Sequence, residues 1–253
     1  MNLEMFSLKG KTAIITGANT GLGQGICVAF AKAGCNIIGV GRRECSETKK
    51  LVEDLNQEFL EVLCDVSNIS DLDRIIEKGN EKFGKIDILV NNAGIIKRTD
   101  SIDVTVEEWD SVLDINLKAA FFLSQKFAKN CIKNNNAGKI INIASMLSYQ
   151  GGFRVVSYCA SKSGINGITK ALCNEWAKYN INVNAIAPGY MATNNTKDLR
   201  NDEKRSDEIL SRIPTGRYGT PDDLMGAAIF LASDASNYVN GFTIAVDGGW
   251  LAR

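Results

Sequence analysis

The sequence contains no histidine, and this absence excludes several kinds of chemistry. Without an imidazole, the protein has neither a Ser-His-Asp nor a Cys-His catalytic arrangement, and it has no metal site built on histidine. Proton transfer must therefore use Tyr, Lys, Asp, Glu or Cys. The seven cysteines stand singly with no C-x-x-C pair, which favours reduced thiols over disulfides or a zinc site, so we expect no metal.

Excess charge of either sign is also missing, because 29 Lys and Arg balance 29 Asp and Glu. Nucleic acids and anionic membranes are usually bound by clustered Lys and Arg, so we expect neither as a partner. The first eleven residues carry an acid and no apolar core, unlike a signal peptide. The uncharged stretch 12–31 contains four glycines, too many for a membrane span. These features predict a cytoplasmic protein.

Short apolar runs alternate along the chain with longer stretches of helical spacing. This alternation predicts a single-domain, Rossmann-like, doubly wound α/β fold over residues 1–253, with a seven-stranded parallel sheet. Only three prolines occur, and no Pro-, Ser- or Gly-rich linker divides the chain. The predicted strands are 12–16, 36–40, 60–64, 86–90, 139–144, 182–187 and 242–246. The predicted helices are 22–32, 46–58, 71–83, 107–133, 157–178 and 221–232.

The segment 188–217 interrupts this rhythm, because it is polar at first and then predicts a short charged helix over 202–211. Ligands of open α/β sheets bind beyond the carboxyl ends of the strands. An insertion at this position is therefore predicted to be a substrate lid.

A glycine-rich turn, Thr16-Gly17-Ala18-Asn19-Thr20-Gly21-Leu22-Gly23, joins the first strand to the first helix. Glycines let the chain turn tightly and bring backbone N–H groups against a pyrophosphate at the helix N-terminus. The alternative is a plain glycine turn, but the strand-turn-helix context favours nucleotide binding.

The second strand ends in Gly41-Arg42-Arg43, where a dinucleotide fold usually has an acid for the adenosine ribose. Arg42 would suit the 2′-phosphate of NADP, or the two arginines are simply solvated. Asp65, after the third strand, is expected either to accept a hydrogen bond from adenine or to mark a helix N-terminus. After the fourth strand, Asn91-Asn92-Ala93-Gly94 can admit a flat ring or tie strand ends together.

Tyr158 and Lys162 lie four residues apart on a predicted helix and so share one face. The ammonium can stabilise the phenolate and lower the tyrosine pKa from about 10 towards neutrality. Ser145, at the end of the fifth strand, can hydrogen-bond a reacting oxygen, and Asn116 can hold a water that connects Lys162 to solvent. Such a Tyr-Lys pair alone is commonplace on protein surfaces, so it becomes specific only with the other residues.

These motifs, together with Pro188-Gly189, resemble the short-chain dehydrogenase/reductase family over essentially the whole chain. The resemblance implies NAD(P)-dependent hydride transfer at a carbonyl or secondary alcohol, with NAD or NADP as the cofactor. It implies that Tyr158 is the acid/base, Lys162 binds ribose and tunes Tyr158, Ser145 orients the substrate, and Asn116 serves a proton relay. The cofactor contacts that it implies are Gly17, Asn19, Thr20, Gly21, Leu22, Gly23, Arg42, Asp65, Val66, Asn92, Ala93, Gly94, Tyr158, Lys162, Pro188, Gly189, Met191 and Thr193.

Segments 140–152, 184–196 and 245–253 further resemble dehydrogenases of deoxy sugar acids in bacterial uronate and pectin breakdown, which are usually NAD-linked. The carboxylate of a sugar acid needs a cation or several N–H donors near the nicotinamide. Arg98 is the first candidate and Arg205 the second, and for each arginine the alternative is a solvated surface position. The complete set of candidate substrate residues is Arg98, Ser145, Gln150, Arg154, Tyr190, Asn194, Arg200 and Arg205.

Other readings of the same motifs are a gluconate 5-dehydrogenase, a 3-oxoacyl thioester reductase, a reductase of a hydrophobic ketone, or a dinucleotide-binding protein without turnover. A protein without turnover need not keep all four proton-handling residues, so their presence favours catalysis. The resemblance also implies a homotetramer that uses the long helices 107–133 and 157–178 with the last helix and strand. The apolar tail 248–251 fits either such an interface or packing within the chain.

Overall fold

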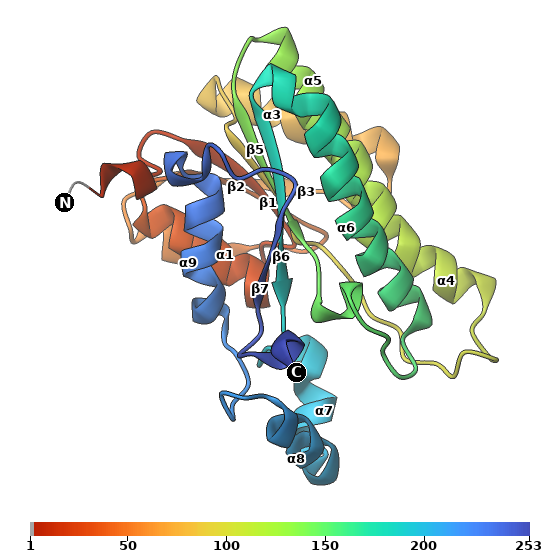
Figure 1. Cartoon of the computed structure of the whole chain (residues 1–253). Helices are drawn as coiled ribbons and strands as arrows, with labels where there is room; N and C mark the ends of the chain where they lie inside the picture. Colours follow the sequence, from red (N-terminus) through yellow and green to blue (C-terminus); the bar gives the residue numbers. More distant parts are fainter. Residues whose placement is uncertain (1–2) are drawn as a thin grey trace.

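A single parallel sheet of seven strands organises the computed structural model, which describes residues 3–253 (Figure 1). The strand order is β3-β2-β1-β4-β5-β6-β7, so the direction of winding reverses between β1 and β4. This architecture confirms the predicted fold class. The strands are β1 (Thr12–Thr16), β2 (Asn36–Gly41), β3 (Phe59–Leu63), β4 (Ile88–Asn91), β5 (Gly138–Ile143), β6 (Ile181–Pro188) and β7 (Thr243–Val246).

Helices cover both faces of the sheet (Figure 1). α1 and α9 pack against each other on one face with α2 beside α1, whereas α3, α5 and α6 lie on the other face with α4 against α6. The α-helices are α1 (Gly21–Lys32), α2 (Ser46–Glu53), α3 (Leu72–Phe83), α4 (Val106–Leu113), α5 (Ala119–Lys133), α6 (Val156–Trp176), α7 (Lys197–Asn201), α8 (Glu203–Arg212) and α9 (Pro221–Ala232). Within residues 3–253, none is long and apolar enough to cross a membrane.

The strand β1 shows why its sequence is apolar throughout rather than alternating. All five of its residues are buried, with Ile15 packed in the core under α1 and α9 and Ile14 in the core under α3 and α5. A strand covered on both faces needs apolar side chains in both directions. Burial of the first strand in turn holds the glycine turn that follows it against the centre of the sheet.

Two helices differ from their predicted extents. The helix predicted over 46–58 ends at Glu53, because the chain reverses at Asn56, whose backbone is left-handed with φ 60°. The helix predicted over 107–133 contains a π-helical turn, Asp114–Lys118, between α4 and α5. Such single turns occur frequently at functional sites. This turn contains Asn116, which is only 2% exposed.

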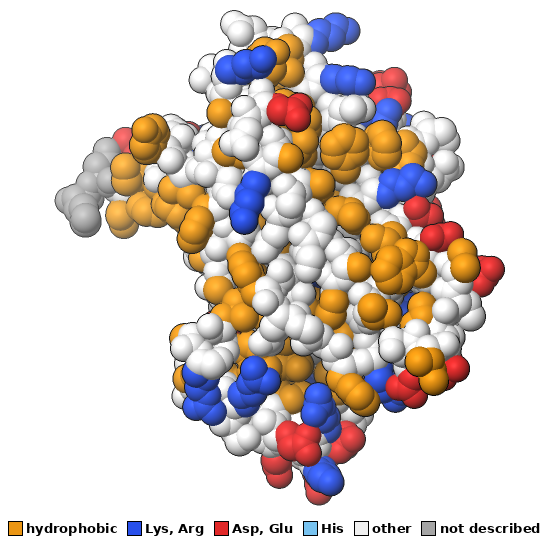
Figure 2. Space-filling view, turned by 45° about the vertical axis from the view of Figure 1, so that its right-hand side comes forward, with side chains coloured by type: hydrophobic (Ala, Val, Ile, Leu, Met, Phe, Trp, Pro, Cys, Tyr) orange, Lys and Arg blue, Asp and Glu red, His pale blue; other side chains and the backbone are white. Residues whose placement is uncertain are grey.

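The segment after β6 leaves the body of the molecule and forms a small lobe from α7 and α8, close to the C-terminus (Figure 1). Basic and acidic side chains gather over this lobe (Figure 2). The predicted charged helix 202–211 corresponds to α8, and α7 is a short helix that the sequence pattern did not indicate. The lobe follows the carboxyl end of β6, and its role as a lid stays a prediction.

Candidate active site

The glycine turn between β1 and α1 is shaped by contacts that only glycine permits. Gly17 and Gly21 have left-handed backbones, with φ of 67° and 60°. A Cβ on Gly23 would lie 2.1 Å from the carbonyl oxygen of Gly17 and 2.6 Å from Nδ2 of Asn92. The first turn of α1 therefore sits directly on the preceding loop, with its N-terminus open to an anion as a pyrophosphate requires.

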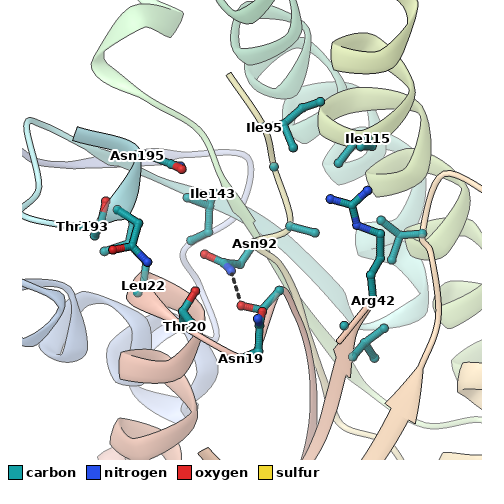
Figure 3. A pocket seen from close by; sticks show the side chains of 18 of the residues that line it. Asn19, Thr20, Leu22, Arg42, Asn92, Ile95, Ile115, Ile143, Thr193 and Asn195 are labelled. Atoms are coloured by element: carbon teal, nitrogen blue, oxygen red, sulfur yellow. Dashed lines mark hydrogen bonds between the residues drawn. The ribbon is translucent and has the colours of Figure 1, made fainter. Parts of the chain in front are cut away.

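A cavity of about 370 Å³ opens above this turn, at the point where the strand order reverses (Figure 3). In open α/β sheets, dinucleotides bind at this position. The cavity extends from Arg42 at the end of β2 to Tyr158 and Lys162 on α6. The predicted cofactor residues that line it are Gly17, Asn19, Thr20, Gly21, Leu22, Arg42, Asp65, Val66, Asn92, Ala93, Gly94, Tyr158, Lys162 and Thr193.

Four predicted cofactor residues lie outside the lining of this cavity. Gly23 packs on the loop beneath it, and Met191 is buried against Gly219. Pro188 ends β6, and Gly189 lets the backbone of the C-terminal tail approach, since a Cβ there would lie 2.7 Å from Cα of Asp247. The structure gives these residues supporting contacts. Their role in cofactor contact stays a prediction.

Gly41 and Arg43, from the segment that the sequence pattern placed near the adenosine ribose, also line the cavity. The sequence patterns did not indicate its other walls, namely Val40, Cys64, Ile95, Ile115, Ile143, Asn194 and Asn195. Apolar side chains such as Ile95 and Ile115 carry no chemical signature that distinguishes a ligand wall from ordinary core (Figure 3). Asn194 is the exception, because we predicted it as a substrate residue rather than a cofactor wall. Its place beside Thr193 brings the segment that follows β6 to the edge of the cavity.

Arg42 and Asp65 face each other at the end of the cavity formed by β2 and β3. Nη1 of Arg42 lies 3.8 Å from Oδ2 of Asp65, and both side chains are partly exposed. Burial alone would raise the pKa of Asp65, but hydrogen bonds from the hydroxyl and amide of Ser67 and the charge of Arg42 hold this pKa below its usual value. Asp65 therefore remains a carboxylate that closes a turn, and α3 begins later, after Asp71.

Asn91 and Asn92 tie strand ends together, as one of their two predicted roles required. Nδ2 of Asn91 donates to Oδ1 of Asn142 on β5 at 2.8 Å and to Oγ of Ser124 on α5 at 2.9 Å. Nδ2 of Asn92 donates to the carbonyl of Thr16 at 2.8 Å, at the start of the glycine turn. The asparagine pair thus fixes β4 to both of its neighbours at the floor of the cavity.

Ser145 and Tyr158 meet at the inner end of the cavity. Ser145 follows β5 and is 7% exposed, and its Oγ accepts a hydrogen bond from the amide of Leu147 at 3.1 Å. Burial raises the pKa of Tyr158 above its ordinary value, although a hydrogen bond with the Ser145 hydroxyl and the charge of Arg98 act in the opposite direction. The expectation of a tyrosine pKa near neutrality was therefore wrong for this structure, because loss of hydration outweighs the stabilising contacts.

Lys162 is 4% exposed and lies with Nζ 5.6 Å from the ring centre of Tyr158. Its ammonium donates to the carbonyl of Ile143 at 2.6 Å, and burial lowers the pKa of Lys162 to about 8. Ser148, which the sequence analysis did not single out, holds this arrangement. Its hydroxyl donates to the carbonyl of Lys162 at 2.7 Å and accepts from the amide of Ser145 at 3.3 Å.

Asn116 holds the loop after β4 against α6. Its Oδ1 accepts from the amide of Ile95 at 2.8 Å, and its Nδ2 donates to the carbonyl of Ile95 and to Oγ of Ser161. The π-helical turn directs the side chain into these contacts. The structure thus gives Asn116 a positioning role, and the relay through a water stays a prediction.

The arginines proposed for a substrate carboxylate differ in their partners. Nε of Arg154 lies 3.0 Å from Oδ1 of Asp100, and Nη1 of Arg205 lies 2.9 Å from Oε2 of Glu208. Arg98 instead donates to the carbonyl of Asn195 at 3.0 Å, and Arg200 to the carbonyl of Thr193 at 3.2 Å. Carboxylate partners neutralise the first two arginines.

Arg212 and Trp250 are two residues beside the candidate site that the sequence analysis did not indicate. The carbon of the Arg212 guanidinium lies 4.2 Å from the centre of the Trp250 ring, and Nη2 lies 3.4 Å from Oε1 of Gln150. Trp250 makes an edge-on contact with Tyr190, with ring centres 4.9 Å apart. Two predicted substrate residues, Gln150 and Tyr190, thus adjoin a cation supplied by α8.

Among residues 3–253, no three His, Cys, Asp or Glu side chains form a group that could hold a metal ion. The seven cysteines are all free thiols. Burial raises the pKa of the thiols that shift, with Cys35 reaching well above its ordinary range.

The winding of the sheet reverses above a glycine turn, Tyr158 and the buried Lys162 line the cavity there, and the buried Ser145 contacts Tyr158. This combination defines a nicotinamide-dependent oxidoreductase. Residues 17–251 match the family described as enoyl-(acyl carrier protein) reductase. The chain belongs to this family of short-chain dehydrogenases/reductases. This membership confirms the predicted enzyme class and the prediction of NAD or NADP as cofactor.

Individual relatives match the chain from end to end. It is 60% identical over 253 residues to the 2-dehydro-3-deoxy-D-gluconate 5-dehydrogenase of Dickeya dadantii and 58% identical to that of Escherichia coli, with 100% of each chain covered. The crystal structure of a gluconate 5-dehydrogenase from Burkholderia cenocepacia, in complex with NADP and tartrate, has a TM-score of 0.95. Its identity is 36%, and the match covers 99% of both chains. The resemblance to sugar-acid dehydrogenases is therefore confirmed.

Proposed function

We propose that the enzyme interconverts 2-dehydro-3-deoxy-D-gluconate and its 2,5-diketo form, a reaction at the C5 hydroxyl of a deoxy sugar acid. The observation that carries this proposal is the contact of Ser145 with Tyr158 at the inner end of a dinucleotide cavity. The names of the relatives from Dickeya dadantii and Escherichia coli support the substrate. The lid 188–217 and a location in the cytoplasm are parts of the same proposal.

The residues that would hold the dinucleotide fit it in shape and polarity. The glycine turn and the N-terminus of α1 suit a pyrophosphate, and the apolar walls Ile95, Ile115 and Ile143 suit a flat ring. When bound, the dinucleotide supplies hydride transfer at the substrate carbon.

The protein's own groups handle the proton. In reduction, the protonated Tyr158 donates its proton to the carbonyl oxygen, and in oxidation the phenolate takes the proton of the hydroxyl. Ser145 hydrogen-bonds the same oxygen and orients it. Lys162 is buried close to the tyrosine ring, where its positive charge favours the phenolate.

The raised pKa of Tyr158 predicts a pH dependence. A phenol whose pKa lies above its ordinary value is protonated at neutral pH, so reduction is favoured there, whereas oxidation needs the deprotonated form. We expect kcat/KM for oxidation to rise as the pH is raised from neutral towards the ordinary phenol value of about 10. Initial rates of oxidation and reduction, measured from neutral pH to about pH 10, test this prediction. A value of kcat/KM for oxidation that does not change with pH would contradict it.

An absorbance assay tests the substrate proposal. Oxidation or reduction of NADH and NADPH is followed with a panel of keto sugar acids, 3-oxoacyl thioesters and a hydrophobic ketone. The proposal expects the highest kcat/KM with 2-dehydro-3-deoxy-D-gluconate or its diketo form. A higher value with gluconate or 5-ketogluconate would favour the second candidate, gluconate 5-dehydrogenase, which the likeness to the Burkholderia cenocepacia enzyme supports. Absence of turnover with every compound would leave a dinucleotide-binding protein.

Arg42 provides a test of cofactor choice. Its partly exposed guanidinium lines the cavity at the end of β2, where it can bind a 2′-phosphate. We expect Arg42→Ala to weaken NADPH binding by about 1 to 3 kcal/mol and to spare NADH, because only NADPH loses a charge-assisted hydrogen bond. Titration with each cofactor measures this, with Lys50→Ala on α2 as a charge control. Equal losses for both cofactors would show that Arg42 does not bind the phosphate.

Assembly as a homotetramer also belongs to the proposal. Exposed apolar side chains on α4, Val106 at 69% and Trp109 at 38%, support an interface beside α6. Trp250 of the tail is instead buried against its own chain, which favours the intrachain alternative for 248–251. Sedimentation velocity would measure the mass of the assembly.

A further inference from the structure

Arg212 joins three segments that are distant in the sequence. It ends α8, it stacks on Trp250 of the C-terminal tail at 4.2 Å, and it reaches Gln150 in the loop after Ser145 at 3.4 Å. Trp250 is 4% exposed and is fixed by an edge-on contact with Tyr190. The tail is held to α8 a second time, since Arg253 donates to the carbonyl of Ser211 at 3.0 Å. Contacts with Trp250 and Gln150 therefore hold the guanidinium of Arg212 in place.

Arg212 lies over the Trp250 ring and is nevertheless exposed, so hydrogen-bond donors of its guanidinium remain available. A guanidinium is planar, and its five N–H donors lie in that plane. When one face rests on an indole ring, the donors point sideways, where they can bind both oxygens of a carboxylate. The contact with Gln150 Oε1 is long, at 3.4 Å, and involves one of these donors.

Arg212 is also free of competing carboxylates. Within the described chain, residues 3–253, no Asp or Glu oxygen lies within 4.0 Å of its nitrogens, whereas Arg205 on the same helix is paired with Glu208. Arg98 likewise has a backbone carbonyl as its partner rather than a carboxylate. Of the arginines around Tyr190, these two therefore keep an uncompensated charge that a substrate anion would neutralise.

The two arginines lie at different distances from the reacting end of the site. Arg98 belongs to the loop after β4, and the next residue, Thr99, is hydrogen-bonded to the loop that precedes α6 and Tyr158. Arg212 instead lies over Trp250 of the C-terminal tail, which also contacts Tyr190. Burial raises the pKa of both Tyr158 and Tyr190, and the arginine charges oppose this rise. The charge of Arg98 acts on both tyrosines, whereas that of Arg212 acts on Tyr190, which agrees with the place of Arg98 nearer the reacting end.

The length of the substrate selects between the two arginines. In a six-carbon acid that reacts at C5, four C–C bonds of about 1.5 Å separate the reacting carbon from the carboxylate carbon, so the two lie about 5 Å apart. An acid that reacts at C3 has only two such bonds between them. Reaction at C5 therefore places the carboxylate away from Tyr158, towards Tyr190 and α8.

We propose that Arg212, supported by Trp250 and Gln150, binds the substrate carboxylate and so decides that C5 rather than a carbon nearer the carboxylate meets Tyr158. This proposal rests on the proposed function, because it takes a six-carbon keto acid as the substrate. Arg98 then lies beside the reacting end and contacts the neighbouring oxygens of the substrate. The role extends the predicted lid, since the cation that recognises the substrate is carried by α8 itself.

The test compares an acid with its neutral form. Steady-state kinetics are measured with 2-dehydro-3-deoxy-D-gluconate and with its methyl ester for the wild type, Arg212→Gln, Arg212→Lys and the control Lys204→Gln, which removes a positive charge elsewhere on α8. We expect Arg212→Gln to raise KM for the acid about 30-fold and to change KM for the ester less than about threefold. Arg212→Lys keeps the positive charge but lacks the planar guanidinium. Its KM for the acid should therefore lie between those of the wild type and Arg212→Gln. Lys204→Gln should match the wild type.

Two further measurements distinguish loss of carboxylate binding from loss of the fold. Binding of NADPH to each variant shows whether the fold is intact, and Trp250→Leu, which removes the support, should raise KM for the acid without a change at residue 212. Equal losses for acid and ester in Arg212→Gln would overturn the proposal. Arg98→Gln is measured with the same two substrates, and an acid-specific loss confined to that variant would also overturn it. If the wild type does not turn over the acid at all, it is the proposed function that fails.

Discussion

Replacement of Tyr158 by phenylalanine is expected to lower kcat by about 100-fold or more and to leave the affinity for the dinucleotide nearly unchanged. The variant removes one hydroxyl, which is the proposed proton donor, and keeps the ring that lines the cavity beside Lys162. Because the sequence has no histidine, no imidazole can replace the lost group. Steady-state kinetics would measure the loss in kcat, and titration with the cofactor would measure the dinucleotide affinity.

Tyr149→Phe is the matched control for this variant. Tyr149 is 54% exposed and lies between β5 and α6, the helix that carries Tyr158. Its activity should equal that of the wild type. If Tyr158→Phe kept more than about a tenth of the wild-type rate, Tyr158 would have to be removed from the acid/base role.

Introduction of a methyl group at Gly23 is the second change with a large expected effect. In Gly23→Ala the new Cβ would meet the carbonyl oxygen of Gly17 at 2.1 Å and Nδ2 of Asn92 at 2.6 Å, which is far inside contact distance. The backbone of the turn has to move, and with it the N–H groups that we propose bind the pyrophosphate. We expect the affinity for NADH and NADPH to fall about tenfold or more, which corresponds to about 1.4 kcal/mol, and the Tm to fall as well.

Gly226→Ala on α9 is the control for loss of glycine flexibility. A Cβ at Gly226 would have no atom within 4 Å, so alanine there should leave cofactor binding unchanged and stabilise the helix by up to about 1 kcal/mol. Fluorescence titration and thermal unfolding of both variants would distinguish them. Wild-type cofactor affinity in Gly23→Ala would show that the close packing of α1 on its loop is not required.

The fold was predictable from the sequence because its signals are local. The continuous apolar run Thr12–Thr16 predicts a strand that is buried on both faces. Gly17, Gly21 and Gly23 predict the turn that follows it. The end of α2 was harder to place, because it depends on one residue, Asn56, with a left-handed backbone. The apolar spacing predicts one continuous helix over 107–133 and so does not reveal the π-helical turn Asp114–Lys118.

The candidate proton-handling residues could be proposed from the sequence because their spacing places Tyr158 and Lys162 on one helical face. Their electrostatics could not, because the pKa of Tyr158 depends on burial by segments far away in the chain. For the same reason the arginines were hard to rank. The pairing of Arg205 with Glu208 is local, three residues apart on the predicted helix. Only the three-dimensional structure shows that Arg212 lies over Trp250, because the two residues are distant in the sequence.

The hydrogen bond from Asn92 to the carbonyl of Thr16 has a consequence for the order of folding. The two residues are 76 positions apart, and β1 lies between β2 and β4 in the sheet. During synthesis, β1, α1 and β2 emerge first, but the glycine turn lacks its partner until β4 has been made and has paired with β1. Such distant pairings form slowly, because loop-closure entropy must be overcome before they contribute. A nascent chain that ends before Asn92 should therefore be unable to bind the dinucleotide, so the ligand can stabilise the fold only after the central strands have assembled.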